Sequence, residues 1–326
     1  MKADPTLILA AFAVSIAAAS SVLAQEQPTR SVTMVVAFPA GGSDDILARI
    51  LAPRLSEFLG QPVTVENVGG SGGTTGTLRV AKAAPDGYEF MLGTSATHAL
   101  SQALYKNPPY NSRADFAPVA LVAEQPFVLI ARKGLPDRLP DFIAFARANE
   151  ATVQYGSAGT GSATHLVCAM FGAATAVKAR HVPYNGGAPA LQDLVAGRID
   201  YFCPVVTIAI PQIENQKVRG VAILTGARSP VLPDLPSAQE QGLSGFAANT
   251  WFGIFLPKAA PLAVVRKLHA ATLAAMDDPT VQKSLRDIGA ELVAPERRTS
   301  DYLQVFLRDD IDKWTKAIKA ADLPFR

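Results

Sequence analysis

Short runs rich in β-branched residues alternate with helical patterns along most of this chain, and this alternation constrains the fold more than any other feature. Strands that alternate with helices form largely parallel sheets with helices packed on their faces. In the first part of the chain the pattern predicts strands at 31–38, 63–67 and 88–92, with helices at 44–59 and 74–83 between them. We therefore expect a doubly wound α/β unit there.

The alternation restarts after an extended segment at 116–131. The predicted helices of this second part lie at 140–148, 162–171 and 188–196, and the predicted strands at 152–155, 179–183, 199–202 and 218–224. These elements complete a second doubly wound half. A chain of 326 residues also exceeds one ordinary core, so two lobes of roughly 100 to 150 residues each are expected.

The last part of the chain is predicted to be an extended segment at 250–256 followed only by helices, at 261–276, 280–288 and 299–320. A helical tail must bury its apolar faces elsewhere, so we expect segment 250–256 to cross back to the first lobe. The predicted domain 1 is then discontinuous, residues 25–125 plus 250–326, and domain 2 comprises residues 126–249. Two crossings between lobes make a hinge. The alternative is three sequential domains, the last a helical unit of about 75 residues.

The N-terminal residues are typical of a secretory signal peptide. Lys2 supplies a positive charge, residues 7–19 form an apolar stretch, and Val22-Leu23-Ala24 is a small-residue cleavage site. We expect residues 1–24 to be removed on export, so that the mature chain begins near Gln25. The alternative is an uncleaved anchor, although the apolar stretch is short for a membrane span.

Charges of both signs are scattered along the chain, with 30 Lys and Arg against 28 Asp and Glu and a net charge of +2. Nucleic acids and anionic membranes attract blocks of basic residues, and this sequence has none. We therefore expect neither as a partner.

Four loops rich in small residues follow predicted strands. They lie at 39–43, 69–75, 156–164 and 184–187. In open α/β sheets, ligands bind beyond the carboxyl ends of the strands, where loops enter helix N-termini. Glycine lets backbone N–H groups approach a ligand, and a helix N-terminus attracts an anion. The alternative is that the glycines only make tight turns. Four such loops, two in each half, favour an anion-binding cleft between the lobes.

Catalytic patterns are weak in this chain. Gly69-Gly70-Ser71-Gly72-Gly73 matches the G-x-S-x-G pattern of a serine hydrolase, but a triad also needs a late His, and His269 lies within a predicted amphipathic helix. His98, His165 and His181 lie on different elements without a partner at i, i+4, so no metal site is expected. No cofactor motif is present. The sequence therefore predicts a protein without catalysis, with serine hydrolase as the remote alternative.

Two adjacent carboxylates and two cysteines are best interpreted as structural residues. Asp44 and Asp45 lie in the first turn of a predicted helix, where their charge offsets the helix dipole, and this role is favoured over acid–base catalysis. Cys168 and Cys203 are compatible with a disulfide in an exported protein. Two buried free thiols are the alternative.

A series of short motifs in fixed order carries a resemblance to a known family. They include Phe38-Pro39-Ala40-Gly41-Gly42 with Asp45 and Ala48-Arg49, Val65-Glu66-Asn67, Pro85-Asp86-Gly87-Tyr88, Thr97-His98-Ala99, Asp115-Phe116-Ala117-Pro118-Val119, Gly156-Ser157-Ala158-Gly159, Val182-Pro183-Tyr184 and Trp251-Phe252-Gly253. Over essentially its whole mature length, the chain resembles the Bug-type extracytoplasmic receptors of the tripartite tricarboxylate transporter family.

The resemblance implies a fold similar to type II periplasmic binding proteins, an α/β protein with two doubly wound lobes joined by a hinge around the ligand cleft. It also implies a periplasmic solute-binding protein that captures a small carboxylate: a dicarboxylate or tricarboxylate, an acidic amino acid or an aromatic acid. We expect the protein to be a monomer. The partner would be a membrane permease. Alternatively, the same cleft would serve a sensor that contacts a signalling ectodomain.

The family's binding loops can be carried over to this sequence residue by residue. The implied ligand-binding residues are Phe38, Pro39, Ala40, Gly41, Gly42, Asp45, Thr94, Ser95, His98, Ser157, Ala158, Gly159, Thr160, Gly161, Ser162, Pro183, Tyr184, Asn185, Gly186 and Asp200. Ser157, Thr160 and Ser162, with adjacent backbone N–H groups, are expected to hold one carboxylate while the first-lobe loops fold over it.

The chain departs from the family pattern at two places. The family often has Arg-Pro where this chain has Val68-Gly69, which concerns the rim of that loop. It usually has no cysteine at the positions of Cys168 and Cys203, and their joint presence supports pairing.

Overall fold

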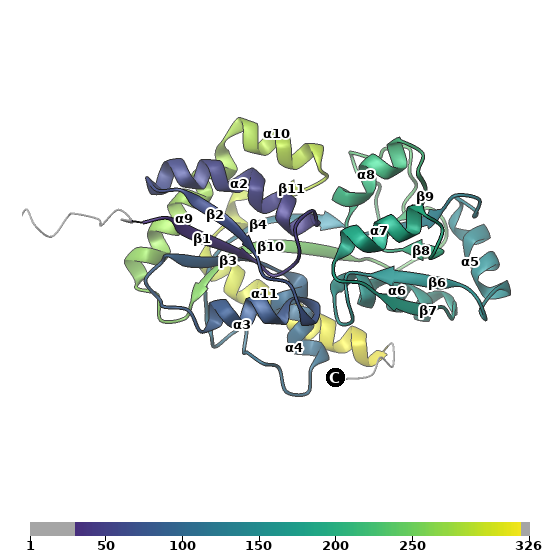
Figure 1. Ribbon diagram of the computed structural model, residues 1–326, viewed down its shortest axis with the longest axis horizontal. Coiled ribbons are helices and arrows are strands. Elements are labelled where there is room, and N and C mark those ends of the chain that lie inside the picture. Colours follow the sequence, from purple (N-terminus) through teal and green to yellow (C-terminus); the bar gives the residue numbers. More distant parts are fainter. Residues whose placement is uncertain (1–29, 321–326) are drawn as a thin grey trace, which may run out of the picture.

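The computed structural model describes residues 30–320, and within them two sheets lie beside each other along the long axis of the molecule (Figure 1). The two-lobed α/β fold expected from the sequence is confirmed. The predicted signal peptide, residues 1–24, lies outside the described residues.

The first sheet has six strands in the order β11-β4-β10-β3-β1-β2. These strands are β1 (Val32–Val36), β2 (Val63–Asn67), β3 (Glu89–Thr94), β4 (Phe116–Pro126), β10 (Asn249–Pro257) and β11 (Glu291–Leu292). Strand β1 pairs in parallel with β2 and β3, whereas β10 runs antiparallel between β3 and β4. The sheet is therefore mixed, because the chain returns through β10 from the second lobe rather than through a helix.

The second sheet has five strands in the order β7-β6-β8-β5-β9. They are β5 (Val128–Arg132), β6 (Gln154–Ser157), β7 (Arg180–Pro183), β8 (Tyr201–Phe202) and β9 (Val218–Ile223). Strand β6 pairs in parallel with β7 and β8, and β5 runs antiparallel to β8 and β9. Sheet membership changes between residues 126 and 128 and again between 223 and 249. We propose that these are the two crossings of the hinge.

Helices cover both faces of the first sheet. They are α2 (Ser43–Leu59), α3 (Thr74–Ala81), α4 (Ser101–Leu104), α9 (Leu262–Asp277), α10 (Pro279–Asp287) and α11 (Ser300–Ala320), with short turns η2 (Ser71–Gly73), η3 (Ser95–Leu100) and η4 (Pro295–Arg297). Helices α9 and α11 both contact β4, which argues against a separate C-terminal unit. The indole of Trp251 on β10 donates to Asp310 Oδ2 at 2.7 Å and so fastens α11 to the sheet.

The second lobe carries α5 (Leu139–Ala148), α6 (Ala163–Thr175), α7 (Gly187–Val195) and α8 (Val206–Glu214). Cys168 of α6 and Cys203, which follows β8, form a disulfide with a Cα–Cα distance of 5.5 Å. Both cysteines are fully buried in the core. The disulfide therefore ties a helix to the sheet beneath it.

Local features explain where the predicted elements agree or differ. Gly60 ends α2 in a left-handed conformation and donates its N–H to Ser56 O, as expected of a C-terminal cap. Helix α3 begins at Thr74, as predicted, with Gly73 as its N-cap. Helix α8 was not predicted because Pro211 interrupts its pattern. The C-terminal tail was predicted to contain only helices, but it also contains strand β11. This strand has two residues and is too short to leave a pattern in the sequence.

Across residues 30–320 no helix is both long enough and apolar enough to span a bilayer.

Candidate functional site

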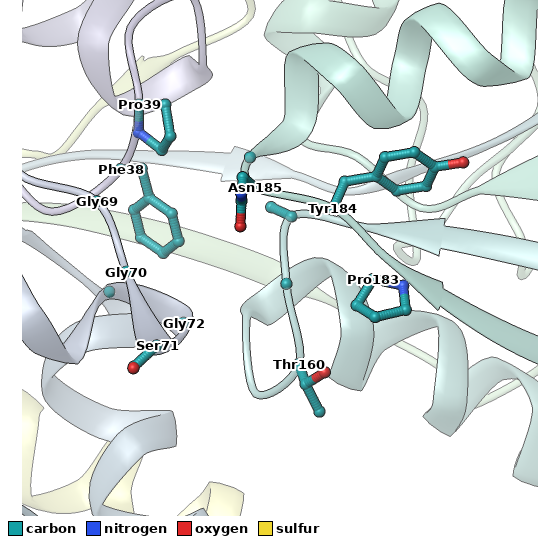
Figure 2. Close-up of a pocket in the computed structure, with 14 residues that line it drawn as sticks. Phe38, Pro39, Gly69, Gly70, Ser71, Gly72, Thr160, Pro183, Tyr184 and Asn185 are labelled. Carbon is teal, nitrogen blue, oxygen red and sulfur yellow. The ribbon is translucent and has the colours of Figure 1, made fainter.

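An open cavity of about 650 Å³ lies between the lobes, and loops from both sheets line it. Its lining residues are Phe38, Pro39, Gly69, Gly70, Ser71, Gly72, Gly73, Ala158, Gly159, Thr160, Pro183, Tyr184, Asn185 and Gly186. Figure 2 shows Phe38, Pro39 and the loop at 69–73, called the glycine loop, on one side, and Thr160, Tyr184 and Asn185 on the other. We call this space the outer cavity.

The location follows from strand direction. The lining loops leave the carboxyl ends of β1, β2, β6 and β7, the positions at which open α/β sheets bind ligands. The glycine loop also admits the Phe38 ring to the cavity wall, because a Cβ atom on Gly73 would lie 3.0 Å from Phe38 Cζ. The cleft expected from four small-residue loops therefore exists as a cavity between the lobes.

A second, smaller cavity of about 60 Å³ adjoins the first and shares Phe38 and Ala158 with it. Its lining is Phe38, Gly42, Ser43, Asp44, Thr94, Ala96, Phe127, Ala158, Ser162, Ala163, Thr164, Gly187, Val205, Ile208 and Thr250. We call this space the inner cavity. The first turns of α2, α6 and α7 all contribute to its wall. Three helix N-termini with unpaired N–H groups make this a favourable place for an anion.

Within residues 30–320, Asp44 is the one charged side chain in the lining of either cavity. Its Oδ1 accepts a hydrogen bond from Ser43 Oγ at 3.2 Å. The pKa of Asp44 is raised to about 6, mainly because burial penalises the charged carboxylate; the Ser43 bond lowers it and the neighbouring Asp45 raises it.

Asp45, by contrast, holds the loop before α2 in place. Its Oδ2 accepts from Gly41 N at 2.9 Å and its Oδ1 accepts from Arg49 Nε at 2.9 Å. Burial acts to raise the pKa of Asp45, but the bonds from Arg49 and Gly41 outweigh it, and the pKa lies below its usual value. Asp45 lines neither cavity, so we assign it a positioning role for the first-lobe loop.

The loop after β6 satisfies most of its own polar groups. Ser157 is fully buried, and its Oγ lies 2.6 Å from His181 Nε2 and accepts from Gly159 N at 3.1 Å. Ser162 caps α6, where its Oγ accepts from His165 N at 3.3 Å. These two serines were expected to bind the ligand directly. The structure has them holding the loop, and of the two only Ser162 lines a cavity.

Backbone N–H groups of the same loop are also engaged. Ala158 N donates to Thr164 Oγ1 at 2.8 Å, Gly161 N to His165 Nδ1 at 3.2 Å, and Ser162 N to Gly159 O at 3.0 Å. The rings of His165 and His181 stack with centroids 4.1 Å apart beneath this loop. These N–H groups of the loop are thus already hydrogen-bonded within it, and the first turns of the three helices are the better source of donors for an anion.

Two residues expected at the cleft lie elsewhere. His98 is fully buried in the first lobe and stacks on Phe255 at 3.9 Å, where burial lowers its pKa to about 3. Asp200 precedes β8, at the end of the sheet opposite the cavity, where it accepts from Gln154 N at 2.8 Å and pairs with Arg132. Each side chain contacts a structural partner and lines neither cavity, so we propose neither as a ligand contact.

The remaining expected residues divide between the two cavities and the loops behind them. Gly42 and Thr94 line the inner cavity, whereas Ala40, Gly41, Ser95 and Gly161 line neither. Ser95 Oγ lies 2.8 Å from Thr250 Oγ1, across the return of the chain through β10. Sequence reasoning did not find Phe127, Val205, Ile208 and Thr250. Phe127 and Thr250 lie beside the crossings between lobes, and Val205 and Ile208 lie at the start of α8, which was not predicted; neither place carries a local motif.

The structure does not assemble a hydrolase site at Ser71. His269 lies on α9, with its Nε2 3.1 Å from Arg298 O, away from the cavity. Within residues 30–320 there is also no group of three His, Cys, Asp or Glu side chains placed to hold a metal ion.

Comparisons with known proteins agree with this geometry. The family model described as "Tripartite tricarboxylate transporter family receptor" matches residues 47–323. The chain is similar to the solved periplasmic binding protein BugD, with 36% identity, a TM-score of 0.88, and coverage of 91% of this chain and 99% of that one.

Two similar structures contain a ligand. MatC from Rhodopseudomonas palustris, solved with bound malate, is 38% identical with a TM-score of 0.85, over 89% of this chain and 99% of MatC. The R. palustris protein Rpa4515, solved with adipate, is 34% identical with a TM-score of 0.87, over 91% of this chain and 99% of Rpa4515.

Proposed function

Because the chain belongs to the tripartite tricarboxylate transporter family of receptors, we propose that it captures a small carboxylate in the periplasm and delivers it to a membrane permease. The family and its solved relatives are receptors and binding proteins, and we extend this to a protein that binds without catalysis. The permease partner follows from the family's name. The periplasmic location rests on the relatives and on the predicted signal peptide.

The observation that carries the proposal is the convergence of three helix N-termini on the inner cavity. The first turns of α2, α6 and α7 contribute Ser43, Ala163 and Gly187 to its wall. Each first turn has backbone N–H groups without partners inside its own helix, and the helix dipole adds partial positive charge. A carboxylate is the anion that the relatives solved with malate and adipate hold.

Capture requires the lobes to move relative to each other. The chain crosses between them at Phe127 and again before β10, and both crossings lie beside the inner cavity through Phe127 and Thr250. A solute seated there touches both lobes and the crossings at once. It therefore favours the closed arrangement over the open one, in proportion to its extra contacts in the closed state.

The proposal is tested on the mature chain from Gln25, unfolded and refolded to strip any carried-over solute. Thermal unfolding is followed against mono-, di- and tricarboxylates, amino acids and aromatic acids, and each hit is titrated by calorimetry. A ligand that binds only the folded protein raises its melting temperature, so at least one acid should do so in a saturable manner. If no carboxylate shifts the transition while neutral sugars or polyamines do, the proposed function is wrong.

A matched variant links any binding to the cavity. Thr160 lines the outer cavity, whereas Thr152 lies in an exposed turn before β6. Thr160→Ala should weaken binding by about threefold to tenfold, the value of one hydrogen bond. Thr152→Ala should leave the affinity unchanged.

A further inference from the structure

The inner cavity presents a carboxylate where the proposed ligand is itself an acid. Asp44 is the one charged side chain lining either cavity, and no Lys, Arg or His of residues 30–320 lies within ion-pair distance of it. Among the described residues, its one hydrogen-bond partner is the hydroxyl of Ser43. Because the charged side chain in this anion-binding cavity is itself negative, a ligand that also carries a positive charge would pair with it.

The neighbouring aspartate, Asp45, shows which hydrogen-bond donors a fully paired carboxylate in this helix has. Asp45 accepts from both Gly41 N and Arg49 Nε. Asp44 has neither a backbone donor nor a guanidinium. A partly buried carboxylate with one neutral donor has not recovered its lost hydration, and a ligand with positively charged N–H donors can supply what is missing.

Comparison with α11 shows that an aspartate at the second position of a helix does not by itself lie in a cavity. Helix α11 begins with Ser300-Asp301, as α2 begins with Ser43-Asp44, so both aspartates occupy the second helical position. Asp301 is exposed to solvent, whereas Asp44 faces the inner cavity. The placement of Asp44 in the cavity, rather than the helix dipole, makes it available to a ligand.

The groups around Asp44 can recognise both halves of an amino acid. The first turns of α6 and α7 offer N–H donors, and the cavity wall adds the hydroxyls of Thr94 and Thr250. These donors suit a carboxylate, and Asp44 beside them suits an ammonium group. The outer cavity then has room for the rest of the solute.

We propose that the solute is a small acid that also carries a protonated amine, and that Asp44 pairs with this amine and selects amino acids over the corresponding acids without nitrogen. This proposal rests on the proposed function and names the ligand class for the same site. Burial keeps the pKa of Asp44 near 6, so its carboxylate is mostly ionised at neutral pH and repels a second carboxylate there.

The titration of Asp44 is simple to interpret in this environment. Asp45 is the titratable neighbour whose charge acts on it, and no other described residue in the lining of the inner cavity titrates. Pairing with an amine requires ionised Asp44, so affinity for an amino acid should fall as pH falls below about 6. A protonated Asp44 sharing its proton with a ligand carboxylate would give the opposite dependence.

The test compares acids that differ at one substituent: aspartate with malate, 2-aminoadipate with adipate, and phenylalanine with 3-phenylpropionate. Calorimetric titration is performed at pH 8 and pH 5 on the refolded mature protein. In at least one pair, the amino acid should bind about tenfold to a hundredfold more tightly at pH 8, the worth of a charge-assisted hydrogen bond. Its advantage should shrink at pH 5.

Variants assign the preference to Asp44. Asp44→Asn and Asp44→Ser should both abolish the advantage of the amino acid, and thermal unfolding of each verifies that the protein is folded. Asp301→Asn removes the same charge from the same helical position at the surface and should retain the advantage.

The outcomes separate this proposal from the proposed function. If the acids without nitrogen bind as tightly as the amino acids, or if Asp44→Asn keeps the preference, Asp44 does not select an amine, although carboxylate capture stands. If malate or adipate binds more tightly at pH 5 than at pH 8, Asp44 shares a proton with a ligand carboxylate instead of pairing with an amine. If no acid in any pair binds, the selection of an amine by Asp44 is wrong, whereas carboxylate capture fails only if the whole carboxylate panel is also inactive.

Discussion

Gly72 and Thr160 meet across the mouth of the outer cavity: a Cβ atom on Gly72 would lie 3.1 Å from the carbonyl oxygen of Thr160. Gly72 belongs to the loop after β2 in the first lobe, and Thr160 to the loop after β6 in the second. A similar contact links Gly186 with Pro39, where an added Cβ would lie 3.2 Å from Pro39 Cγ. The two lobes therefore approach each other so closely at these glycines that an added Cβ atom would require its neighbours to shift.

Gly72→Ala should hold the lobes apart. The added methyl group meets backbone atoms of Thr160, Gly161 and Ser162, which cannot rotate away as a side chain would. Small-angle scattering should show a larger radius of gyration than for the wild type. The tightest acid found by titration should bind about tenfold more weakly, since closure contacts are lost.

Gly134→Ala is the matched control for this variant. Gly72 and Gly134 have φ of +67° and +86°, so both changes strain the backbone in the left-handed region, but nothing lies within 4 Å of a Cβ on Gly134. Equal affinity and equal radius of gyration in the two variants would show that Gly72 does not limit closure.

Breaking the disulfide should destabilise the second lobe without changing the ligand site. Cys168 and Cys203 are separated by 35 residues, and closing a loop of that length restricts the unfolded chain by about 3–4 kcal/mol. Urea unfolding of the double Cys168→Ala, Cys203→Ala variant should show a loss of this order. The reduced wild type should lose a similar amount, and a loss confined to the double variant would indicate a packing defect instead.

Asp310 should be essential for docking the C-terminal helix. It is 7% exposed and accepts from the indole nitrogens of both Trp251 and Trp314, at 2.7 and 3.2 Å. Asp310→Ala leaves two buried N–H groups unpaired and should cost about 2–4 kcal/mol in the free energy of unfolding, measured by urea denaturation. Asp310→Asn keeps one acceptor oxygen and should cost less; equal losses would contradict this account.

Asp44 should make the ligand-free protein more stable as the pH falls. Its pKa in the folded protein is about 6, above the ordinary aspartate pKa of 3.8, so the folded state binds a proton more tightly than the unfolded state. The unfavourable ionised form is fully present above pH 6 and is relieved as pH falls towards 4. Asp44→Asn should therefore stabilise the protein at pH 7 by roughly 1–2 kcal/mol, reduced from the full shift because the side chain is only partly buried.

Denaturation by urea between pH 4.5 and 8 measures this effect. The stabilisation by Asp44→Asn should shrink towards the acidic end of the range. Asp301→Asn removes the same favourable interaction with a helix dipole and serves as the reference. A constant difference between the two variants over the whole range would show that Asp44 does not titrate as described.

Much of the secondary structure could be predicted because its signals are local. Strand β2 was expected at 63–67 and is observed there, and Gly60 ends α2 as a C-terminal cap. Helix α8 and strand β11 were missed, since Pro211 breaks the helical pattern and a two-residue strand has no pattern of its own. The antiparallel insertion of β10 between β3 and β4 depends on a return of the chain that no local signal encodes.

The candidate site divides in the same way. The loops after β1, β2, β6 and β7 were recognised because glycine-rich segments follow β-branched runs. His98 and Asp200 were placed at the cleft on motif position alone. The structure turns His98 into the core beside Phe255 and leaves Asp200 at the far end of β8.

The sequence by itself determined the alternation of strands and helices, the loops able to cradle an anion, and the family, because these depend on backbone conformation and short motifs. Only the tertiary structure decided which polar groups remain for a ligand. Ser157 is hydrogen-bonded to His181, and Asp45 is paired with Arg49. Asp44, next to Asp45 in the sequence, lies in the cavity and accepts a hydrogen bond only from the Ser43 hydroxyl among the described residues. Hydrogen-bond satisfaction depends on neighbours distant in the chain, and a pattern of residue types does not contain them.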